Sequence, residues 1–325
     1  MNQLYTFDDI LDILEQEIEI LGFDKKSGSL FTPISYVLSQ GGKRVRPVLA
    51  LMSYNLFRED LSNIIPVALG IEIFHNFTLL HDDLMDRSDM RRNKPTVHVK
   101  WNDNIAILSG DVMLTESYRE ICKISSDLLK PVLNLFSDTA TEIYCGQQFD
   151  MEFEDRLDVT IEEYLEMIRL KTAVLLGCAT KGGAIVARAN DNDANHLYDF
   201  GANLGLAFQL KDDLLDVYGD TENFGKKIGG DIVCNKKTYL LINALSDKSV
   251  RQELVYWIEK TDFDREEKIG AITAVYNKLN IKEKTEGLIQ EYYEKALRSL
   301  DKVSVENSRK KELTQLVQNL MFRNS

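Results

Sequence analysis

The sequence predicts an all-α protein, and three observations support this. All five prolines among the 325 residues lie between Pro33 and Pro131, so the rest of the chain contains no residue that forbids a helix interior. Apolar residues recur at spacings of three and four, for example over 161–176 and 197–215. Alternating runs beside turn dipeptides are scarce, so strands are not expected.

The helices follow in order from this periodicity and from the signals at their ends. The first is expected over 7–21, where acidic residues after Thr6 favour the positive end of a helix dipole. Pro47, near a first turn, supports a helix over 46–57. Further helices are expected over 31–38, 64–86, 104–129, 132–149, 161–189 and 192–218, with several more from Tyr239 onward.

Clear breaks between these helices are few. They are Gly41-Gly42, the basic stretch 87–94, the acidic stretch around Asp155, and the segment 219–235, which contains Gly225. None is a long linker rich in proline or serine. A single domain over 1–325 is therefore expected.

Composition excludes several classes of function. With 39 basic and 52 acidic side chains, the net charge is −13, the wrong sign for holding nucleic acid or anionic lipid through a general field. Any anionic ligand must be held by local basic clusters or by bridging metal ions. The four cysteines form no CxxC pair, which indicates reduced thiols in a cytoplasmic protein. No stretch approaches the roughly 20 apolar residues of a membrane span.

An aspartate motif, DDxxD, occurs three times, at 8–12, 82–86 and 212–216. Because residues i and i+4 share a helix face, Asp82 and Asp86 should project together, with Asp83 to the side. Such carboxylates repel each other unless hard cations lie between them. Mg²⁺ typically takes one or two carboxylates and completes its octahedron with water and substrate phosphates.

The surroundings separate the three copies. The copy at 8–12 follows Thr6 and has no lysine or arginine nearby in sequence, so it is expected to be only a helix start. Metal-binding carboxylates beside cations form the arrangement that a diphosphate needs, although a solvated acidic face stays an alternative for either other copy alone. The cations that follow those two copies are Arg87, Arg91, Arg92 and Lys94, and then Lys226, Lys227, Lys236 and Lys237.

A further basic cluster spans 41–47, with the sequence GGKRVRP. Lys43 and Arg46 at the start of a helix make a plausible metal-free anion site, and an exposed basic turn is the alternative. No nucleotide-binding glycine loop of either common type follows a strand here.

Taken together, these residues resemble the trans-isoprenyl diphosphate synthases, the polyprenyl synthetases, from Gly41 to about Leu241. The order of the landmarks makes the resemblance specific. They are Gly42 to Pro47, His75, His81 to Asp86, Arg91 to Thr96, Gly146-Gln147, Asp150, Lys171-Thr172, Phe208-Gln209, Asp212 to Asp216, and Gly225-Lys226 through Asp231 to Lys236 and Thr238.

The resemblance implies the isoprenoid synthase fold, with antiparallel helices around a deep central cavity and two aspartate-rich helices facing across it. Family members, which are expected to be homodimers, add isopentenyl diphosphate to an allylic diphosphate (dimethylallyl, geranyl or farnesyl) and release pyrophosphate, with three Mg²⁺ ions. By position, the metal ligands would be Asp82, Asp86 and Asp212, supported by Asp83, Asp213 and Asp216. The allylic diphosphate would be held by Arg91, Lys171, Gln209, Lys226 and Lys236, and isopentenyl diphosphate by Lys43, Arg46, His75 and Arg92.

The chemistry agrees with two differently held diphosphates. Breaking the allylic C–O bond requires stabilisation of the leaving pyrophosphate, whereas isopentenyl diphosphate must be bound without ionising. Thr172 and Gln209 are expected near the carbocation, on the family mechanism. A lone histidine is more often a core or surface residue, but His75 lies two turns before Asp82 on the same face, which favours a binding role.

Product length is expected to depend on Phe77 and Thr78, which precede Asp82 by about one turn. In the family, an aromatic residue at the earlier position goes with short products, so a product of fifteen or twenty carbons is expected. Phe74 or Met113 could line the pocket instead. Two departures from the family pattern are Lys227, where proline is frequent, and Asn235, where glycine is common.

Other interpretations stay open. A longer-chain synthase needs only a deeper pocket. A terpene cyclase usually replaces the second aspartate motif, a noncatalytic subunit of a heteromeric synthase is expected to have lost aspartates or lysines, and an acidic helical scaffold does not need the paired basic clusters.

Overall fold

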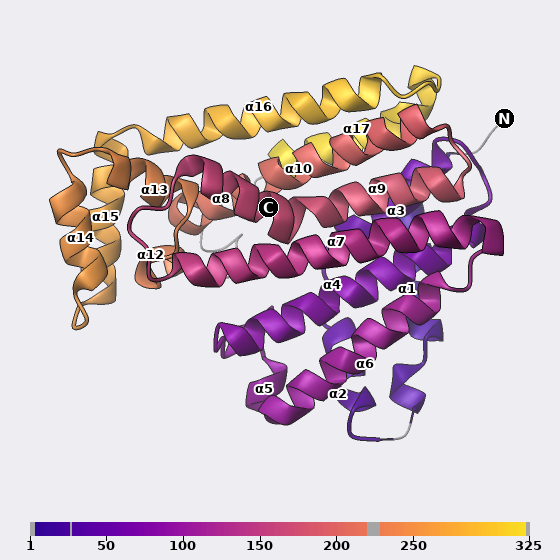
Figure 1. The fold of residues 1–325 in the computed structure, drawn as a ribbon, viewed down its shortest axis with the longest axis horizontal. Helices are drawn as coiled ribbons and strands as arrows, with labels where there is room; N and C mark the ends of the chain where they lie inside the picture. The colour runs from indigo at the N-terminus through magenta and orange to yellow at the C-terminus, as the bar shows by residue number, and fades with distance from the viewer. Residues whose placement is uncertain (1–3, 27, 220–227, 323–325) are drawn as a thin grey trace. The chain divides into compact units, whose positions relative to one another are not determined.

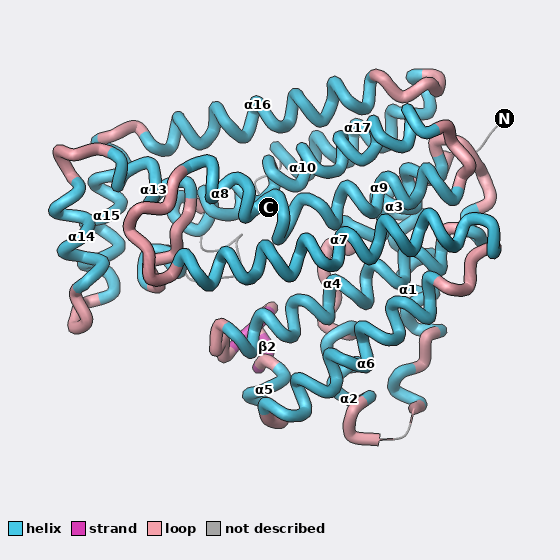
Figure 2. Tube along the Cα trace, in the orientation of Figure 1, coloured by secondary structure: helices cyan, strands magenta, loops and turns pink. Residues whose placement is uncertain are grey.

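The computed structural model describes residues 4–26, 28–219 and 228–322 (Figure 1). Within these residues the regular secondary structure is helical apart from one short hairpin (Figure 2). Its strands β1 (Met90–Arg91) and β2 (Lys94–Pro95) pair antiparallel, with Met90 opposite Pro95 and Arg91 opposite Lys94. The predicted all-α class is confirmed. No helix in the described ranges combines the length and the apolar character needed to cross a bilayer.

Helices occupy most of the predicted stretches. In chain order they are α1 (Phe7–Ile20), η1 (Phe23–Lys25), α2 (Phe31–Leu38), α3 (Val45–Asn55), η2 (Leu61–Asn63), α4 (Ile65–Met85), α5 (Val97–Lys100), α6 (Asp103–Ile121), α7 (Ser126–Phe153), α8 (Ile161–Ile168), η3 (Arg169–Ala173), α9 (Val174–Val186), α10 (Asp191–Tyr218), α12 (Gly230–Val233), α13 (Tyr239–Ser246), α14 (Arg251–Glu259), α15 (Arg265–Lys278), α16 (Ile281–Asp301) and α17 (Asn307–Phe322).

The structure corrects two of the predicted helices and confirms one predicted break. The predicted helix over 104–129 ends at Ile121, and α7 begins at Ser126 and passes through Pro131, at the loss of one backbone hydrogen bond. The predicted helix over 161–189 contains a π-helical turn, η3. The basic stretch 87–94, predicted as a break, leads into the β1–β2 hairpin.

The chain divides into two units, one formed by 1–137, 178–198 and 301–316, and the other by 138–177, 199–300 and 317–325. In the first unit, α4 packs closely along α6 (Figure 1). A Cβ added to Gly70 of α4 would lie 2.6 Å from Ile121 and 2.8 Å from the carbonyl oxygen of Ser117. Phe74 of α4 meets Phe136 edge to face at 5.0 Å. The single domain over 1–325 stays a prediction.

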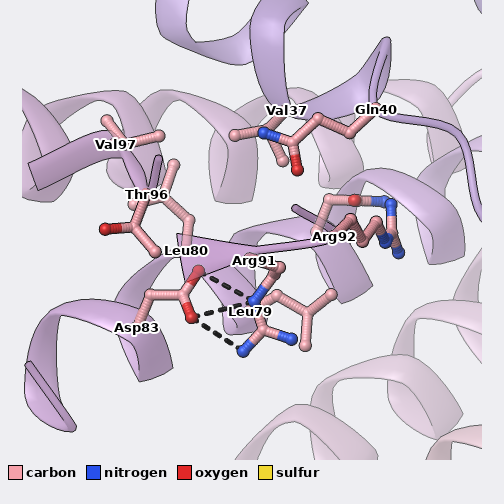
Figure 3. A pocket seen from close by; sticks show the side chains of 10 residues that line it. Val37, Gln40, Leu79, Leu80, Asp83, Arg91, Arg92, Thr96 and Val97 are labelled. Carbon is pink, nitrogen blue, oxygen red and sulfur yellow. Dashed lines mark hydrogen bonds and ion pairs between the residues drawn. The ribbon is translucent and has the colours of Figure 1, made fainter. Parts of the chain in front are cut away.

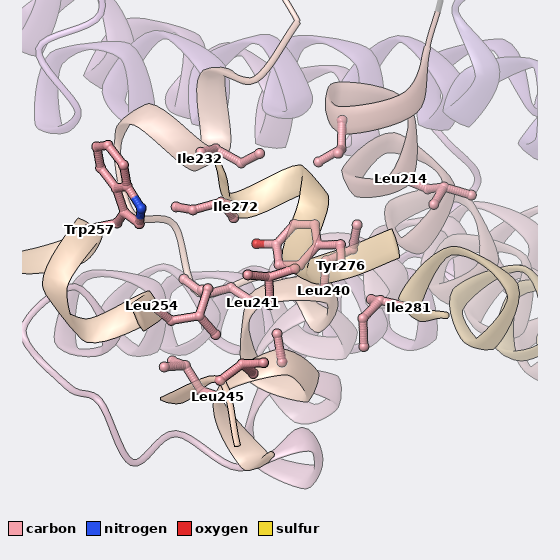
Figure 4. Packing of buried hydrophobic residues seen from close by; sticks show 14 residues of the cluster. Leu214, Ile232, Leu240, Leu241, Leu245, Leu254, Trp257, Ile272, Tyr276 and Ile281 are labelled. Carbon is pink, nitrogen blue, oxygen red and sulfur yellow. The ribbon is translucent and has the colours of Figure 1, made fainter. Parts of the chain in front are cut away.

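The core of the second unit gathers α13, α14 and α15 around the end of α10 (Figure 4). Leu240, Leu254 and Ile281 have no more than 1% of their surface exposed, and the Tyr276 ring lies among them. A second cluster joins Tyr164 of α8 with Leu210 of α10 and Tyr239 of α13. These contacts fix α8, η3 and α10, and η3 and α10 carry most of the predicted site residues of this unit.

Candidate active site

The aspartate motif at 82–86, called the first motif from here on, ends helix α4. Asp82 and Asp83 lie in its last turn, and Asp86 is the C-terminal cap. The three side chains differ in burial as the helix periodicity predicts, because Asp83 is 5% exposed, whereas Asp82 is partly buried and Asp86 is exposed. Asp82 and Asp86 therefore present the more accessible carboxylates of this motif.

Arg91 of the hairpin binds Asp83 (Figure 3). Its Nε lies 2.8 Å from both carboxylate oxygens of Asp83, and its Nη2 lies 2.8 Å from Asp83 Oδ1 and 3.8 Å from Asp82 Oδ2. Burial raises the pKa of Asp83, and the hydrogen bond from Arg91 opposes that rise. The pair lines a space of about 10 Å³, the size of one water molecule. Asp83 thus fixes the direction of Arg91, which is predicted to bind the allylic diphosphate.

The hairpin also brings Arg92 to the glycine pair. Arg92 and Asn93 form its two-residue turn, with φ of 51° and 59°, the left-handed geometry that suits a tight hairpin. The guanidinium of Arg92 donates to the carbonyl oxygen of Gly41. A Cβ on Gly42, whose φ is +138°, would lie 2.9 Å from Nη2 of Arg92. Two basic clusters that are separate in sequence therefore meet here.

Arg46 and His75 form the centre of this basic group. Nη1 of Arg46 lies 3.0 Å from Nε2 of His75, and since a guanidinium only donates, Nε2 accepts and the proton of the neutral ring lies on Nδ1. The pKa of His75 is well below its ordinary value, because the ring is buried and because Arg46 and Arg92 are cationic neighbours. Lys43 is exposed on the same loop.

Arg44 is the buried arginine of this loop, and sequence reasoning left it without a role. Its side chain is buried, with Nη1 2.6 Å from Glu72 Oε1, Nε 2.9 Å from Glu15 Oε1, and Nη2 2.7 Å from the carbonyl oxygen of Leu38. Its φ of 45° places it in the left-handed region. Glu72 in the middle of the apolar helix α4 was the available signal, since a buried carboxylate needs a cationic partner.

In the second unit, the π-helical turn η3 carries Lys171 and Thr172. Nζ of Lys171 lies 2.6 Å from Oδ2 of Asp150 on α7. The hydroxyl of Thr172 donates to Oε1 of Gln209 at 3.0 Å. π-Helical turns are rare and concentrate at functional sites, because they redirect side chains that a regular helix would place elsewhere.

Two glycines enclose this turn. A Cβ on Gly146 of α7 would lie 2.4 Å from the backbone nitrogen of Lys171, and one on Gly205 of α10 would lie 2.6 Å from the Cα of Ala173. Both neighbouring atoms belong to the backbone of η3, so they cannot move without moving the turn. The close approach explains the glycine of the Gly146-Gln147 landmark, whereas Gly205 and the π geometry were missed.

The aspartate motif at 212–216, called the second motif, lies in the last turns of α10. Its buried member, Asp213, is held by two hydrogen bonds. Tyr164 donates to Oδ2 of Asp213 at 2.5 Å, and Nε2 of Gln209 lies 2.9 Å from Oδ1. Burial, together with the nearby charge of Asp231, raises the pKa of Asp213 to about 7. Thr172, Gln209 and Asp213 thus form one hydrogen-bonded series.

Asp216 anchors the segment that contains Lys236. Its Oδ2 accepts from the backbone N–H of Asp231 at 2.9 Å, and its carbonyl oxygen accepts from that of Gly229. Burial raises the pKa of Asp150, but the charges of Lys171 and Lys236 outweigh it and lower that pKa, and the charge of Lys236 also opposes the rise in the pKa of Asp213. Lys226, also a predicted ligand of the allylic diphosphate, lies outside the described residues.

The carboxylates can be compared with what Mg²⁺ requires. Within the ranges that the structure describes, no three His, Cys, Asp or Glu side chains gather into a complete metal cage. Asp83 and Asp213 are instead held by neighbouring side chains, and Asp82, Asp86 and Asp212 are the more accessible members. This donor set fits an ion that takes one or two carboxylates and completes its shell with water and phosphate oxygens. The ligand roles of all six aspartates stay predictions.

The predicted chain-length residues lie on α4, one turn before the motif. Phe77 is 5% exposed and meets the ring of His81 edge to face at 4.8 Å, with Phe74 at 5.6 Å. Thr78 turns its hydroxyl back to the carbonyl oxygen of His75. Phe77 thus belongs to the apolar interior of the first unit, whereas Thr78 is bonded to its own helix.

Comparisons with known proteins agree with this geometry. The polyprenyl synthetase family model matches residues 28–278. The short chain isoprenyl diphosphate synthase of Methanocaldococcus jannaschii is 39% identical over 237 residues, covering 73% of this chain and 72% of that protein. The geranylgeranyl diphosphate synthase of Methanosarcina mazei is 38% identical over 246 residues, covering 75% and 76%.

A solved structure extends the likeness over nearly the whole chain. A crystal structure of a geranylgeranyl pyrophosphate synthase superposes with a TM-score of 0.93 at 40% identity, covering 99% of this chain and 100% of that one. The sequence landmarks, the helical fold and these relatives agree. The chain therefore belongs to the polyprenyl synthetase family of prenyltransferase enzymes.

Proposed function

We propose that this enzyme condenses isopentenyl diphosphate with an allylic diphosphate to give a short all-trans prenyl diphosphate, most specifically the twenty-carbon geranylgeranyl diphosphate. One observation carries the proposal: in each unit that contains one of these aspartate motifs, a carboxylate holds a predicted phosphate-binding cation in place. Asp83 holds Arg91 in the first unit, and Asp150 holds Lys171 in the second. The names of the relatives support the substrate class and the twenty-carbon product.

The allylic diphosphate would be bound by the aspartate motifs and their cations. Asp82, Asp86 and Asp212 would hold three Mg²⁺ ions, which when bound neutralise the negative charge of the leaving pyrophosphate. Arg91, Lys171 and Lys236, with Lys226, would hold its phosphate oxygens directly. The hydrogen-bonded series of Thr172, Gln209 and Asp213 would place the dipoles of Thr172 and Gln209 next to the carbocation.

Isopentenyl diphosphate would be bound by Lys43, Arg46, His75 and Arg92 without metal. The neutral His75 ring accepts from Arg46, so the guanidinium is held in one orientation. Isopentenyl diphosphate is not allylic, so its C–O bond would not ionise to a stabilised cation, and a site of cations and N–H groups can hold it without metal. In the reaction one C–O bond breaks, one C–C bond forms, and a proton leaves to the departing pyrophosphate.

The assay that tests this function combines the purified protein with isopentenyl diphosphate and geranyl or farnesyl diphosphate, with and without Mg²⁺. Pyrophosphate release is expected only when both substrates and Mg²⁺ are present, and the main product should contain twenty carbons. Release from the allylic substrate alone would indicate a cyclase or a hydrolase instead. Absence of metal-dependent release would overturn the proposal.

Phe77→Ala is expected to lengthen the product, because removing the ring opens apolar space one turn before Asp82. Products of twenty-five carbons or more should appear by chromatography. Phe77→Leu, a smaller loss of volume, should give an intermediate distribution and guards against loss of folding. Phe74→Ala tests whether Phe74, rather than Phe77, limits the length of the product. An unchanged distribution in both Phe77 variants would exclude this residue as the limit.

Two further properties stay predictions, the first from the resemblance and the second from the cysteines. We expect a homodimer and a location in the cytoplasm. Sedimentation of the purified protein checks the first, and fractionation of the producing cells checks the second.

A further inference from the structure

Lys268 is a fully buried lysine on α15, with 0% of its surface exposed. Its Nζ lies 2.7 Å from Oδ1 of Asn235 and 4.2 Å from the centre of the Phe263 ring. Its Nζ also donates to the carbonyl oxygen of Val233 at 3.5 Å, so both hydrogen-bond acceptors are neutral, and burial lowers its pKa. A buried ammonium whose partners are neutral destabilises the fold, so its position calls for an explanation other than stability.

The partner of Lys268 is a residue in an unusual backbone conformation. Asn235 has a φ of 56°, the left-handed region that favours glycine and that asparagine also tolerates. Its Nδ2 donates to the carbonyl oxygen of Ile258 at 3.1 Å, while its Oδ1 accepts from Lys268. A glycine at this position could adopt the same φ but has no side chain to make these bonds. The asparagine therefore ties this turn to α14 and α15.

The next residue along the chain is Lys236. Its backbone N–H donates to the carbonyl oxygen of Asp231 at 2.9 Å, which closes the turn around Asn235. Nζ of Lys237 donates to the carbonyl oxygens of Asn235 and Glu154, at 3.2 and 2.8 Å, and so holds the turn from its other side. Because Asn235 is fixed through both its backbone and its side chain, the direction in which Lys236 leaves the turn is also fixed.

We propose that Asn235 and Lys268 are positioning residues that set the place of the Lys236 ammonium against the diphosphate of the allylic substrate, an inference that rests on the function proposed above. Lys268 touches neither Lys236 nor the aspartate motifs in the contacts described. It acts through the Asn235 side chain. The free-energy cost of burying the Lys268 ammonium is thereby offset by a more precise contact between Lys236 and the allylic diphosphate.

The experiment compares Lys268→Met, Asn235→Gly and the double variant, each assayed for both substrates. Lys268→Met keeps an unbranched side chain against Phe263 and removes a buried charge, so its unfolding midpoint should equal or exceed that of the parent. Its KM for geranyl diphosphate should rise about tenfold, while its KM for isopentenyl diphosphate changes less than about twofold. Lys278→Met, an exposed lysine on the same helix, is the matched control and should change neither KM.

The double variant separates positioning from folding. Asn235→Gly removes the nearer acceptor of the Lys268 ammonium and leaves only the more distant carbonyl oxygen of Val233, so this variant should unfold at a lower temperature and show the raised KM. Adding Lys268→Met should restore the unfolding midpoint without restoring the KM, and the two KM effects should not add. Recovery of the parent KM together with stability would show that the pair serves folding alone, and would overturn the inference.

Lys236→Met, assayed in parallel, distinguishes failure of this inference from failure of the proposed function. A raised KM for geranyl diphosphate in Lys236→Met, with parent values in Lys268→Met and Asn235→Gly, overturns only the positioning role. An unchanged KM in Lys236→Met overturns the assignment of Lys236 to the diphosphate, and the positioning role with it.

Discussion

Asp82→Asn and Asp212→Asn should each lower kcat/KM by about a thousandfold or more, equivalent to about 4 kcal/mol of transition-state stabilisation. Each change removes one negative charge and keeps the shape of the side chain. The hydrogen bonds that hold the motifs in place are accepted by the neighbouring Asp83 and Asp213, which these variants leave intact. The unfolding midpoint should therefore stay within a few degrees of the parent value.

The aspartate motif at 8–12, the third motif, supplies the control. Asp8 stands in the same place in its motif as Asp82, but it is exposed in the first turn of α1, where Thr6 and Asp9 form a capping box. Asp8→Asn should leave kcat/KM unchanged and cost only about 0.3–1 kcal/mol of stability through the helix dipole. The measurement is kcat/KM against Mg²⁺ concentration. If Asp8→Asn and Asp82→Asn lost activity equally, the distinction between the motifs would be wrong.

This third motif also shows how far sequence reasoning reaches. Its prediction as a helix start is confirmed by the capping box, because capping depends on residues within one turn of each other. The all-α class was predictable for a similar reason, since periodicity and proline placement are properties of neighbouring residues. Pro131 is the exception, because α7 continues through it although local preference predicts a break there.

The candidate site was predictable in its residues and not in its contacts. Spacing alone indicated that Asp83 would turn away from Asp82, and burial agrees. That Arg91 would hold Asp83, or that Arg44 would turn inward to Glu72, depends on a hairpin and a loop whose positions no local pattern gives. The π geometry at Lys171 depends likewise on close contact with other helices. The meeting of Asp82 and Asp212 over one cavity stays a prediction.

Gly146→Ala is expected to destabilise the protein by about 1–3 kcal/mol and to weaken catalysis at the same time. The added Cβ would lie 2.4 Å from the backbone nitrogen of Lys171 and 2.8 Å from its Cα, distances that no side-chain rotation can relieve. The π turn must move, and the pairing of Lys171 with Asp150 and of Thr172 with Gln209 must change with it. A rise in KM for the allylic substrate should therefore accompany the loss of stability.

Two glycines provide the comparison for Gly146→Ala. Gly205→Ala meets the Cα of Ala173 at 2.6 Å and should behave like Gly146→Ala, because it presses on the same turn from α10. Gly270 on α15 is exposed and has no atom within 4 Å of the added Cβ, so Gly270→Ala should stabilise the protein by about 0.5–1 kcal/mol. Denaturant unfolding measures all three. Gain of stability in Gly146→Ala would mean that α7 and η3 can separate, and that the π turn does not depend on their close packing.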